Sequence, residues 1–355
     1  MSKKHNFSAG PCILPQEVFQ KSAEAILDFN GSGLSLLEIS HRSKDFVAVM
    51  DEARAIVKRL MKLGDDYEVI YLGGGASMQF AMVPFNLMKS EGGKAAYINT
   101  GTWAAGAIKE AKKLGTVDVV GSSQEENYSF IPKGYQVGNE YDYFHCTSNN
   151  TIYGSQMREF PKVDTLVVCD MSSDIFSRVI DFSQFDIIYA GAQKNMGPAG
   201  TTLVVVKKEI LGKTGRDIPS MLDYSLHIAK ESMYNTPPVF PVYASLLTLQ
   251  HLENNGGIAA AEVRNEAKAK LIYGEIDRNP LFETFCTVEE DRSLMNVSFK
   301  LLDESKKEEF DNAWKAAGIS GLNGHRSLGG YRASMYNALP IESVQVLVDV
   351  MQNLK

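Results

Sequence analysis

Lys194 is the residue of this 355-residue sequence whose type and position most strongly suggest chemistry. It follows an apolar run at residues 185–190, typical of a buried strand, and precedes a turn signal, Gly197-Pro198. A second apolar run at 201–206 predicts another strand, so the lysine lies in a tight corner between two strands. An amine partly withdrawn from water has a lowered pKa, and its neutral form can make a Schiff base with an aldehyde. The alternative is an ordinary surface lysine, which is the commoner use of this residue.

A glycine-rich segment, Gly73-Gly-Gly-Ala-Ser77, lies between a predicted strand at residues 67–72 and an apolar helical stretch that extends to about residue 88. Backbone N–H groups at such a strand-to-helix turn can hold a phosphate, and Ser77 adds a hydroxyl donor. The segment lacks a P-loop lysine and the Gly-x-Gly-x-x-Gly spacing, so nucleotide binding is disfavoured. A tight turn without a ligand explains this segment at least as well.

Trp103 and Asp170 also stand near the ends of predicted strands. Trp103 precedes a helical run at 104–114 and could offer an aromatic plane for a planar ligand, although tryptophan more often anchors a core. Asp170 directly follows the apolar run 165–169, at the strand end where open α/β sheets bind ligands. The competing interpretation makes Asp170 a cap for the segment that follows it.

These four features together match the contacts that pyridoxal phosphate requires. They are a phosphate cradle, a stacking aromatic ring, a carboxylate for the pyridinium nitrogen and a lysine for the aldehyde. A further pattern is a repeated His-Arg pair beside small residues, in Ser40-His-Arg-Ser43 and Gly324-His-Arg-Ser327, both in predicted loops.

The elements that must position these residues alternate over the first two-thirds of the chain. Strands are predicted at residues 67–72, 94–99, 116–120, 165–169, 185–190 and 201–206. Helices are predicted at 16–30 and around 46–60, the second ending near Gly64. Helical segments between several of the strands predict an α/β fold with a largely parallel sheet between helices.

This rhythm changes after Asn254-Asn-Gly-Gly257. The sequence then predicts a long helix to about residue 277, a strand at 294–299, a helix at 304–317, a loop at 321–331 and a terminal helix from residue 341. Such an order indicates a smaller α+β domain. We therefore predict a large domain over residues 16–256 and a small domain formed by residues 1–15 and 257–355.

Composition narrows the classes of partner. A net charge of -7 argues against a nucleic-acid or anionic-membrane surface, and no apolar stretch is long enough to span a bilayer. The four cysteines form no Cys-x-x-Cys pair and the six histidines show no ligand spacing, so no metal is expected. The first seven residues lack a hydrophobic signal core, which predicts a cytoplasmic protein.

Five segments, in order along the whole chain, resemble the phosphoserine aminotransferase family within the fold-type I, class V pyridoxal-phosphate-dependent aminotransferases. The segments are Asn6-Phe-Ser-Ala-Gly-Pro11, Gly73-Gly-Gly-Ala-Ser-Met-Gln-Phe80, Gln193-Lys194-Asn195, Tyr234-Asn-Thr-Pro-Pro238 and Gly324-His-Arg-Ser-Leu-Gly-Gly-Tyr-Arg-Ala-Ser-Met-Tyr-Asn-Ala-Leu-Pro340. The resemblance implies a large domain with a mainly parallel, seven-stranded sheet and a smaller C-terminal domain.

The resemblance also implies a role for each site residue. Lys194 would form the Schiff base with pyridoxal 5'-phosphate, Asp170 would pair with the ring nitrogen, and Trp103 would stack on the ring. The other implied cofactor contacts are Ala76, Ser77, Thr151 and Gln193, with Asn235 and Thr236 from a second subunit of a homodimer. The implied substrate contacts are Arg332 for the α-carboxylate and His41, Arg42, His325 and Arg326 for the distal anion.

The implied reaction is transamination between O-phospho-L-serine and 2-oxoglutarate, which gives 3-phosphooxypyruvate and glutamate. Serine biosynthesis is the reverse direction, and 4-phosphohydroxy-L-threonine in pyridoxine biosynthesis is a further implied substrate. Some relatives carry a basic residue where this chain has Ser77. Because this chain lacks that basic residue, more of the anion recognition is left to Arg42, His325 and Arg326. Guanidinium groups can bind both carboxylate and phosphate.

Two kinds of alternative remain at the level of sequence. Within class V, cysteine desulfuration needs a cysteine on a mobile loop, and alanine–glyoxylate transamination needs no second anion site. Outside it, a phosphate-binding protein or a lysine aldolase without pyridoxal phosphate would also use a phosphate cradle or an activated lysine.

Overall fold

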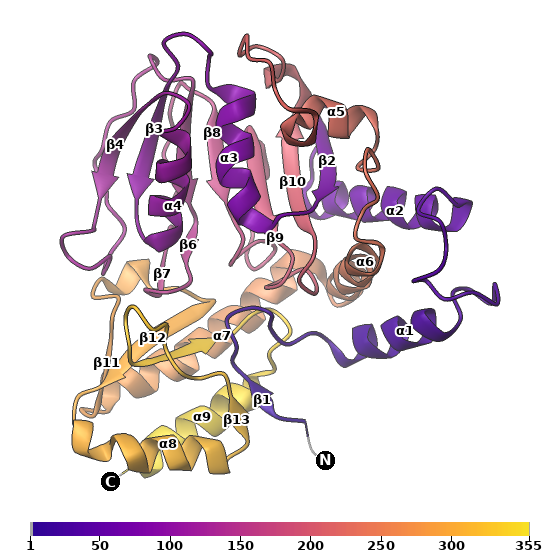
Figure 1. Cartoon of the computed structure of the whole chain (residues 1–355). Coiled ribbons are helices and arrows are strands. Elements are labelled where there is room, and N and C mark those ends of the chain that lie inside the picture. The colour runs from indigo at the N-terminus through magenta and orange to yellow at the C-terminus, as the bar shows by residue number, and fades with distance from the viewer. Residues whose placement is uncertain (1–2, 355) are drawn as a thin grey trace.

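The computed structural model describes residues 3–354, and its centre is a seven-stranded sheet with the order β2-β10-β9-β8-β5-β3-β4. β10 is antiparallel to both of its neighbours, while the other neighbouring strands run parallel. The predicted α/β fold, a mainly parallel sheet between helices, is confirmed (Figure 1). The strands of this sheet are β2 (Tyr67–Leu72), β3 (Lys94–Asn99), β4 (Thr116–Ser122), β5 (Tyr143–Thr147), β8 (Val167–Asp170), β9 (Ile187–Gly191) and β10 (Thr202–Lys207).

Helices bury both faces of this sheet, because successive side chains of a strand point to opposite faces. On β10, Leu203 and Val205 belong to the core shared with α2 and α6, whereas Val204 and Val206 belong to the core shared with α3 and α4. Apolar runs without alternation in the sequence therefore reflect burial on both sides. The helices of this part are α1 (Gln16–Leu27), α2 (Lys44–Met61), α3 (Gly75–Leu87), α4 (Thr102–Ala111), α5 (Tyr224–Ala229) and α6 (Val239–Asn254).

A separate hydrophobic core lies below the large sheet in Figure 1. Its antiparallel sheet, β11-β12-β14, packs with three helices, and Phe7 and Ile13 of the N-terminal arm join the same core. A short parallel pair, β1 with β13, fixes that arm. The elements are β1 (His5–Asn6), α7 (Gly257–Arg278), β11 (Phe282–Thr284), β12 (Asn296–Leu301), α8 (Lys307–Ala316), β13 (Ile319–Ser320), β14 (Tyr331–Ser334) and α9 (Ile341–Asn353). Between β5 and β8 in the chain, β6 (Asn149–Asn150) and β7 (Ser155–Gln156) form a small antiparallel hairpin.

The division of the chain into two domains stays a prediction. Ile258 on α7 packs in the core of the large sheet, and Ile272 on the same helix packs in the second core, so one helix belongs to both. Residues 1, 2 and 355 of the predicted small domain lie outside the described residues.

Several predicted elements differ in the structure. β5 was not predicted, because His145 and Thr147 interrupt its apolar pattern. The predicted loop at 321–331 ends in β14. The first helix ends at Leu27, before residue 30. α2 ends at Met61, and Lys62 after it adopts the left-handed conformation expected of Gly64.

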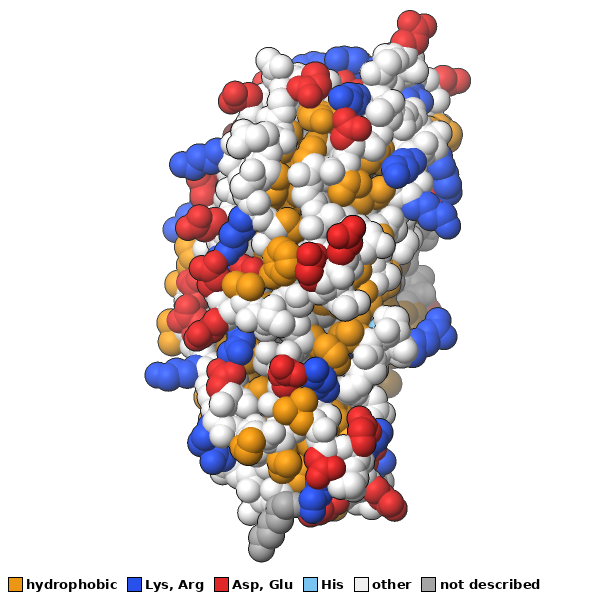
Figure 2. Space-filling model, turned by 90° about the vertical axis from the view of Figure 1, so that its left-hand side faces the viewer, with side chains coloured by type: hydrophobic (Ala, Val, Ile, Leu, Met, Phe, Trp, Pro, Cys, Tyr) orange, Lys and Arg blue, Asp and Glu red, His pale blue; other side chains and the backbone are white. Residues whose placement is uncertain are grey.

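Acidic and basic side chains are interspersed over the face shown in Figure 2, so neither sign dominates it. In residues 3–354, no helix combines the length and apolar character needed to cross a membrane. The same residues contain no cluster of three or more histidine, cysteine, aspartate or glutamate side chains that could hold a metal ion.

Candidate functional site

Lys194 lies in the turn that joins β9 to β10, and its side chain is directed into the protein. Its Nζ donates a hydrogen bond to Thr151 Oγ1 at 2.8 Å. Burial lowers the pKa of Lys194 to about 8, a shift that the negative charge of Asp170 opposes and the positive charge of Arg332 assists. The amine therefore has a substantial neutral fraction near physiological pH, unlike a solvated lysine.

Asp170 is the last residue of β8, at the carboxyl end of the parallel strands, and only 4% of it is exposed. Its Oδ1 accepts a hydrogen bond from the backbone N–H of Ser172 at 2.9 Å. Burial raises the pKa of Asp170, while the contacts with Ser172 and the charge of Lys194 lower it. The capping hydrogen bond predicted as an alternative does exist, but the segment after it forms turns and no helix.

One pocket brings these two side chains together with the start of α3 and with Trp103. Gly74 and Gly75 adopt positive φ values of 89° and 67°, so the chain turns sharply before the helix. The first N–H groups of a helix have no partner within it, which leaves the start of α3 suited to a phosphate. The pocket is lined by Gly75, Ala76, Ser77, Phe80, Trp103, Thr147, Asn149, Thr151, Asp170, Ser172, Ser173, Gln193 and Lys194.

Trp103 is not a core anchor, because 42% of it is exposed at the first turn of α4. A second feature of the lining is Thr147 Oγ1, which is buried and has no hydrogen-bond partner in the protein. An exposed aromatic face, an unpartnered hydroxyl, a carboxylate and a buried amine around one pocket fit a planar, phosphorylated aldehyde. The donor set therefore fits pyridoxal phosphate.

Arg332, on β14, reaches the edge of this pocket. Its Nη1 lies 3.4 Å from the carbonyl oxygen of Thr151, and its Nε is buried without a partner. The guanidinium thus retains donors for a carboxylate. Burial is the main cause that lowers the pKa of His325. The positive charges of Arg332 and Arg326 lower it further, so His325 lies near both arginines. The structure therefore groups three of the predicted substrate contacts.

Other predicted residues are not brought to this pocket within one chain. His41 and Arg42 lie in the connection between α1 and α2, and Asn235 and Thr236 lie in the connection between α5 and α6. None of these four residues lines the pocket that holds Lys194. Arg42, Asn235 and Thr236 are exposed.

An asparagine bridge, formed by Asn195, Asn337 and Asn265, was missed in the sequence. Asn195 Oδ1 accepts a hydrogen bond from the backbone N–H of Asn337 at 2.9 Å, and Asn337 Oδ1 accepts one from Asn265 Nδ2 at 2.8 Å. Asn337 Nδ2 also donates to the carbonyl of Phe176 at 2.9 Å. The bridge ties the Lys194 turn to the segment after Asp170 and to the chain that continues from Arg332. The sequence shows only that Asn195 directly follows Lys194, because its hydrogen-bond partners lie far away in the chain.

We expect Asn195→Ala to separate these segments. The variant loses buried hydrogen bonds, so the free energy of unfolding should fall by about 1–3 kcal/mol, and misplacement of Arg332 relative to Lys194 should lower kcat/KM by roughly tenfold or more. Denaturant unfolding and steady-state kinetics measure the two effects. Asn195→Asp keeps the acceptor for Asn337 but loses the donor to the carbonyl of Ile175, so it should recover only part of kcat/KM. A destabilised Asn195→Ala enzyme with wild-type kcat/KM would contradict a positioning role.

The pKa of Lys194 predicts a pH dependence for cofactor uptake by the apoprotein. With a pKa of Lys194 lowered to about 8, the fraction of its amine in the neutral form rises about fivefold from pH 7 to pH 8. This fraction levels off above about pH 9. Stopped-flow absorption should show the rate of covalent uptake following that curve. In Arg332→Gln the curve should move to higher pH, because a neighbouring positive charge is gone. A rate that still rises tenfold per pH unit up to pH 10 would indicate an unperturbed amine.

Comparisons with known proteins address the family of this chain. The sequence matches the family described as "Aminotransferase class-V" over residues 4–347. It is 71% identical to the phosphoserine aminotransferase of Flavobacterium psychrophilum and 68% identical to that of Flavobacterium johnsoniae, with 99% of each chain covered in both cases. Among solved structures, a phosphoserine aminotransferase from Bacillus circulans subsp. alkalophilus superposes with a TM-score of 0.95 at 42% identity, covering 99% of this chain and 98% of that one. A pyridoxal-phosphate-bound phosphoserine aminotransferase from Trichomonas vaginalis gives 0.93 at 34%, covering 99% and 100%.

Proposed function

The chain belongs to the class V aminotransferase family, and we propose that it acts as a phosphoserine aminotransferase with pyridoxal phosphate as its cofactor. Glutamate and 3-phosphooxypyruvate then exchange an amino group and give 2-oxoglutarate and O-phospho-L-serine, the precursor of serine. The observation that carries this chemistry is the meeting of Lys194, Asp170 and the start of α3 in one pocket.

The lining residues divide the work of holding the cofactor. Pyridoxal phosphate supplies an aldehyde and a ring that withdraws electrons from the substrate Cα. The N–H groups at Ala76 and Ser77 would bind the phosphate, together with Gln193, and Thr151 would lie near the ring hydroxyl. Trp103 would cover one face of the ring, and Asp170 would hold a proton on the ring nitrogen.

Lys194 has two tasks in this assignment. Its amine would bind the cofactor aldehyde, and when free it would act as the base that holds and moves the proton of the substrate Cα. A general base works best when its pKa lies near the operating pH, and burial brings the pKa of Lys194 to about 8. Thr151, which accepts the hydrogen bond from Nζ, orients the amine.

Substrate recognition is assigned to the arginines around the pocket. Arg332 would bind the α-carboxylate, which glutamate and phosphoserine share. His325 and Arg326, with His41 and Arg42, would bind the distal phosphate or carboxylate. Without a basic residue at Ser77, these side chains carry more of the discrimination between the two anions.

We propose a homodimer with shared sites, which would give a role to the residues that one chain leaves outside its pocket. Asn235 and Thr236 are exposed, and in this proposal they reach the phosphate in the partner's pocket. Lys194→Ala and Thr236→Asp should each be inactive alone, but subunit exchange between them creates one intact site per hybrid, or about a quarter of wild-type activity in an equal mixture. No recovery after verified exchange would contradict shared sites. A cytoplasmic location stays a prediction.

The substrate assignment is tested by comparing amino acceptors. With glutamate as donor, kcat/KM should be highest for 3-phosphooxypyruvate and much lower for pyruvate and glyoxylate, because the distal basic side chains have no anion to bind in the latter two. A preference for glyoxylate would favour alanine–glyoxylate transamination instead. Cysteine desulfuration is disfavoured, since Cys146, Cys169 and Cys286 are buried and burial raises the pKa of the Cys12 thiol to about 12.

A further inference from the structure

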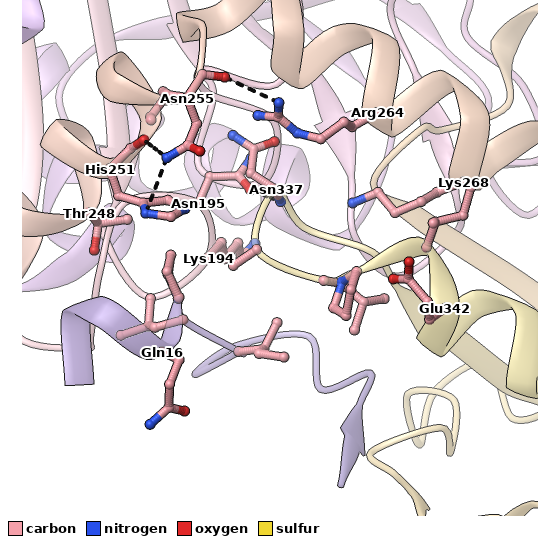
Figure 3. Close-up of a pocket in the computed structure, with 18 of the residues that line it drawn as sticks. Gln16, Lys194, Asn195, Thr248, His251, Asn255, Arg264, Lys268, Asn337 and Glu342 are labelled. Carbon is pink, nitrogen blue, oxygen red and sulfur yellow. Dashed lines mark hydrogen bonds between the residues drawn. The ribbon is translucent and has the colours of Figure 1, made fainter. Parts of the chain in front are cut away.

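A second cavity lies between the N-terminal arm, the end of α6, α7 and the start of α9 (Figure 3). Its volume is about 680 Å³, within the usual range for small-molecule sites. Lys194 and Asn195 form part of its wall, but Ala76, Ser77, Trp103 and Asp170 do not line it. Most of the remaining wall is apolar and includes Ile13, Leu14, Leu252, Val263, Leu339 and Ile341.

Two cationic side chains from neighbouring turns of α7, Arg264 and Lys268, line this cavity (Figure 3). Lys268 is 1% exposed, and its Nζ donates to the carbonyls of Met335 and Tyr336 at 2.8 and 2.9 Å. An ammonium group has three N–H donors, so one remains without an acceptor in the protein. Arg264 Nη1 donates to the carbonyl of Asn255 at 3.2 Å, which leaves most of the guanidinium free.

Within residues 3–354, neither cation lies within 4.0 Å of a carboxylate oxygen. Burial, followed by the positive charge of Arg264, lowers the pKa of Lys268 to about 7. Glu342 is the one carboxylate in the lining, and His251, on the opposite side, contacts Glu17 at 3.1 Å. Burying the ammonium of Lys268 is costly unless an anion compensates it, and no carboxylate among the described residues forms an ion pair with it.

We propose that this cavity binds a small amphipathic carboxylate, with its anionic end at Arg264 and Lys268 and its apolar body against the side chains of α6, α9 and the N-terminal arm. A carboxylate can accept from the free guanidinium donors and from the third N–H of Lys268. The apolar wall excludes a small, fully solvated anion such as inorganic phosphate as the preferred ligand. This site is distinct from the transaminase pocket and shares only the Lys194 turn with it.

The test is isothermal titration of the holoenzyme with octanoate, and with octanol as the uncharged match. The titration uses the Arg332→Gln holoenzyme, so that binding at Arg332 does not contribute. We expect one octanoate per chain and at least tenfold weaker binding of octanol, since only octanoate engages the two cations. No binding of octanoate, or equal binding of both probes, would overturn the proposal.

Variants locate the site. Arg264→Gln and Lys268→Met should each weaken octanoate binding about tenfold or more, whereas Lys270→Gln, on the same helix but outside the cavity, should leave it unchanged. Should Lys268→Met fail to fold, the largely exposed Arg264 still decides the matter. Wild-type affinity in Arg264→Gln, or an equal loss in Lys270→Gln, would place octanoate elsewhere and contradict the assignment.

Discussion

Lys194→Ala is expected to lose transamination by at least about 10³-fold, because the variant lacks both the covalent attachment of the cofactor and the base that moves the Cα proton. The loss should appear in kcat for either half-reaction, measured in single turnovers with phosphoserine and with glutamate. Noncovalent cofactor binding should persist, since the contacts at α3, Trp103 and Asp170 remain.

Two controls distinguish this outcome from unfolding or general lysine loss. Lys213→Ala removes an exposed lysine that does not line the pocket and should keep wild-type rates. A small primary amine added to Lys194→Ala should restore part of the rate by acting as the missing base. If Lys194→Ala turns over like wild type, the amine has neither task.

Asp170→Asn should lower kcat by roughly 10²–10³-fold while the protein still folds and binds the cofactor. An amide cannot carry the negative charge that favours a proton on the ring nitrogen, so the ring withdraws electrons less effectively. The variant keeps the shape of the side chain and can still accept from the backbone N–H of Ser172.

The comparison for Asp170→Asn is Asp217→Asn, an exposed carboxylate that does not line the pocket. Thermal unfolding should show similar stabilities for both variants and the wild type. A kcat within twofold of wild type in Asp170→Asn would mean that this carboxylate does not act on the cofactor ring.

The centre of the site could be predicted because its signals are local. The strands that flank Lys194 and precede Asp170 are short apolar runs buried on both faces, and such runs are recognisable without any partner in view. The glycines before α3 are equally local, since their positive φ values need residues without a side chain.

β5 could not be recognised because its polar residues are buried, and the partner of His145 lies far away in the sequence. His145 Nε2 shares a hydrogen bond with Tyr189 OH at 2.8 Å, and Tyr97 stacks on the His145 ring. Burial then lowers the pKa of His145 to about 3, so the ring is neutral within the sheet core. Thr147, at the end of the same strand, was missed as a pocket residue because β5 itself was not predicted.

Long-range contacts also explain the rest of the site. The asparagine bridge joins residues 195, 265 and 337, whose amide groups look like ordinary loop or helix residues until the two cores are packed together. The roles of Arg42, Asn235 and Thr236 came from the resemblance to a family, because nothing in one folded chain brings them to Lys194.

Borohydride reduction followed by peptide mass spectrometry tests the central claim most directly. Reduction fixes pyridoxal phosphate to the amine that carries it, and proteolysis then identifies the modified lysine. We predict a phosphopyridoxyl group on Lys194, lost when phosphoserine or glutamate is added before reduction. A modification on any other lysine, or none in protein supplied with the cofactor, would contradict the assignment.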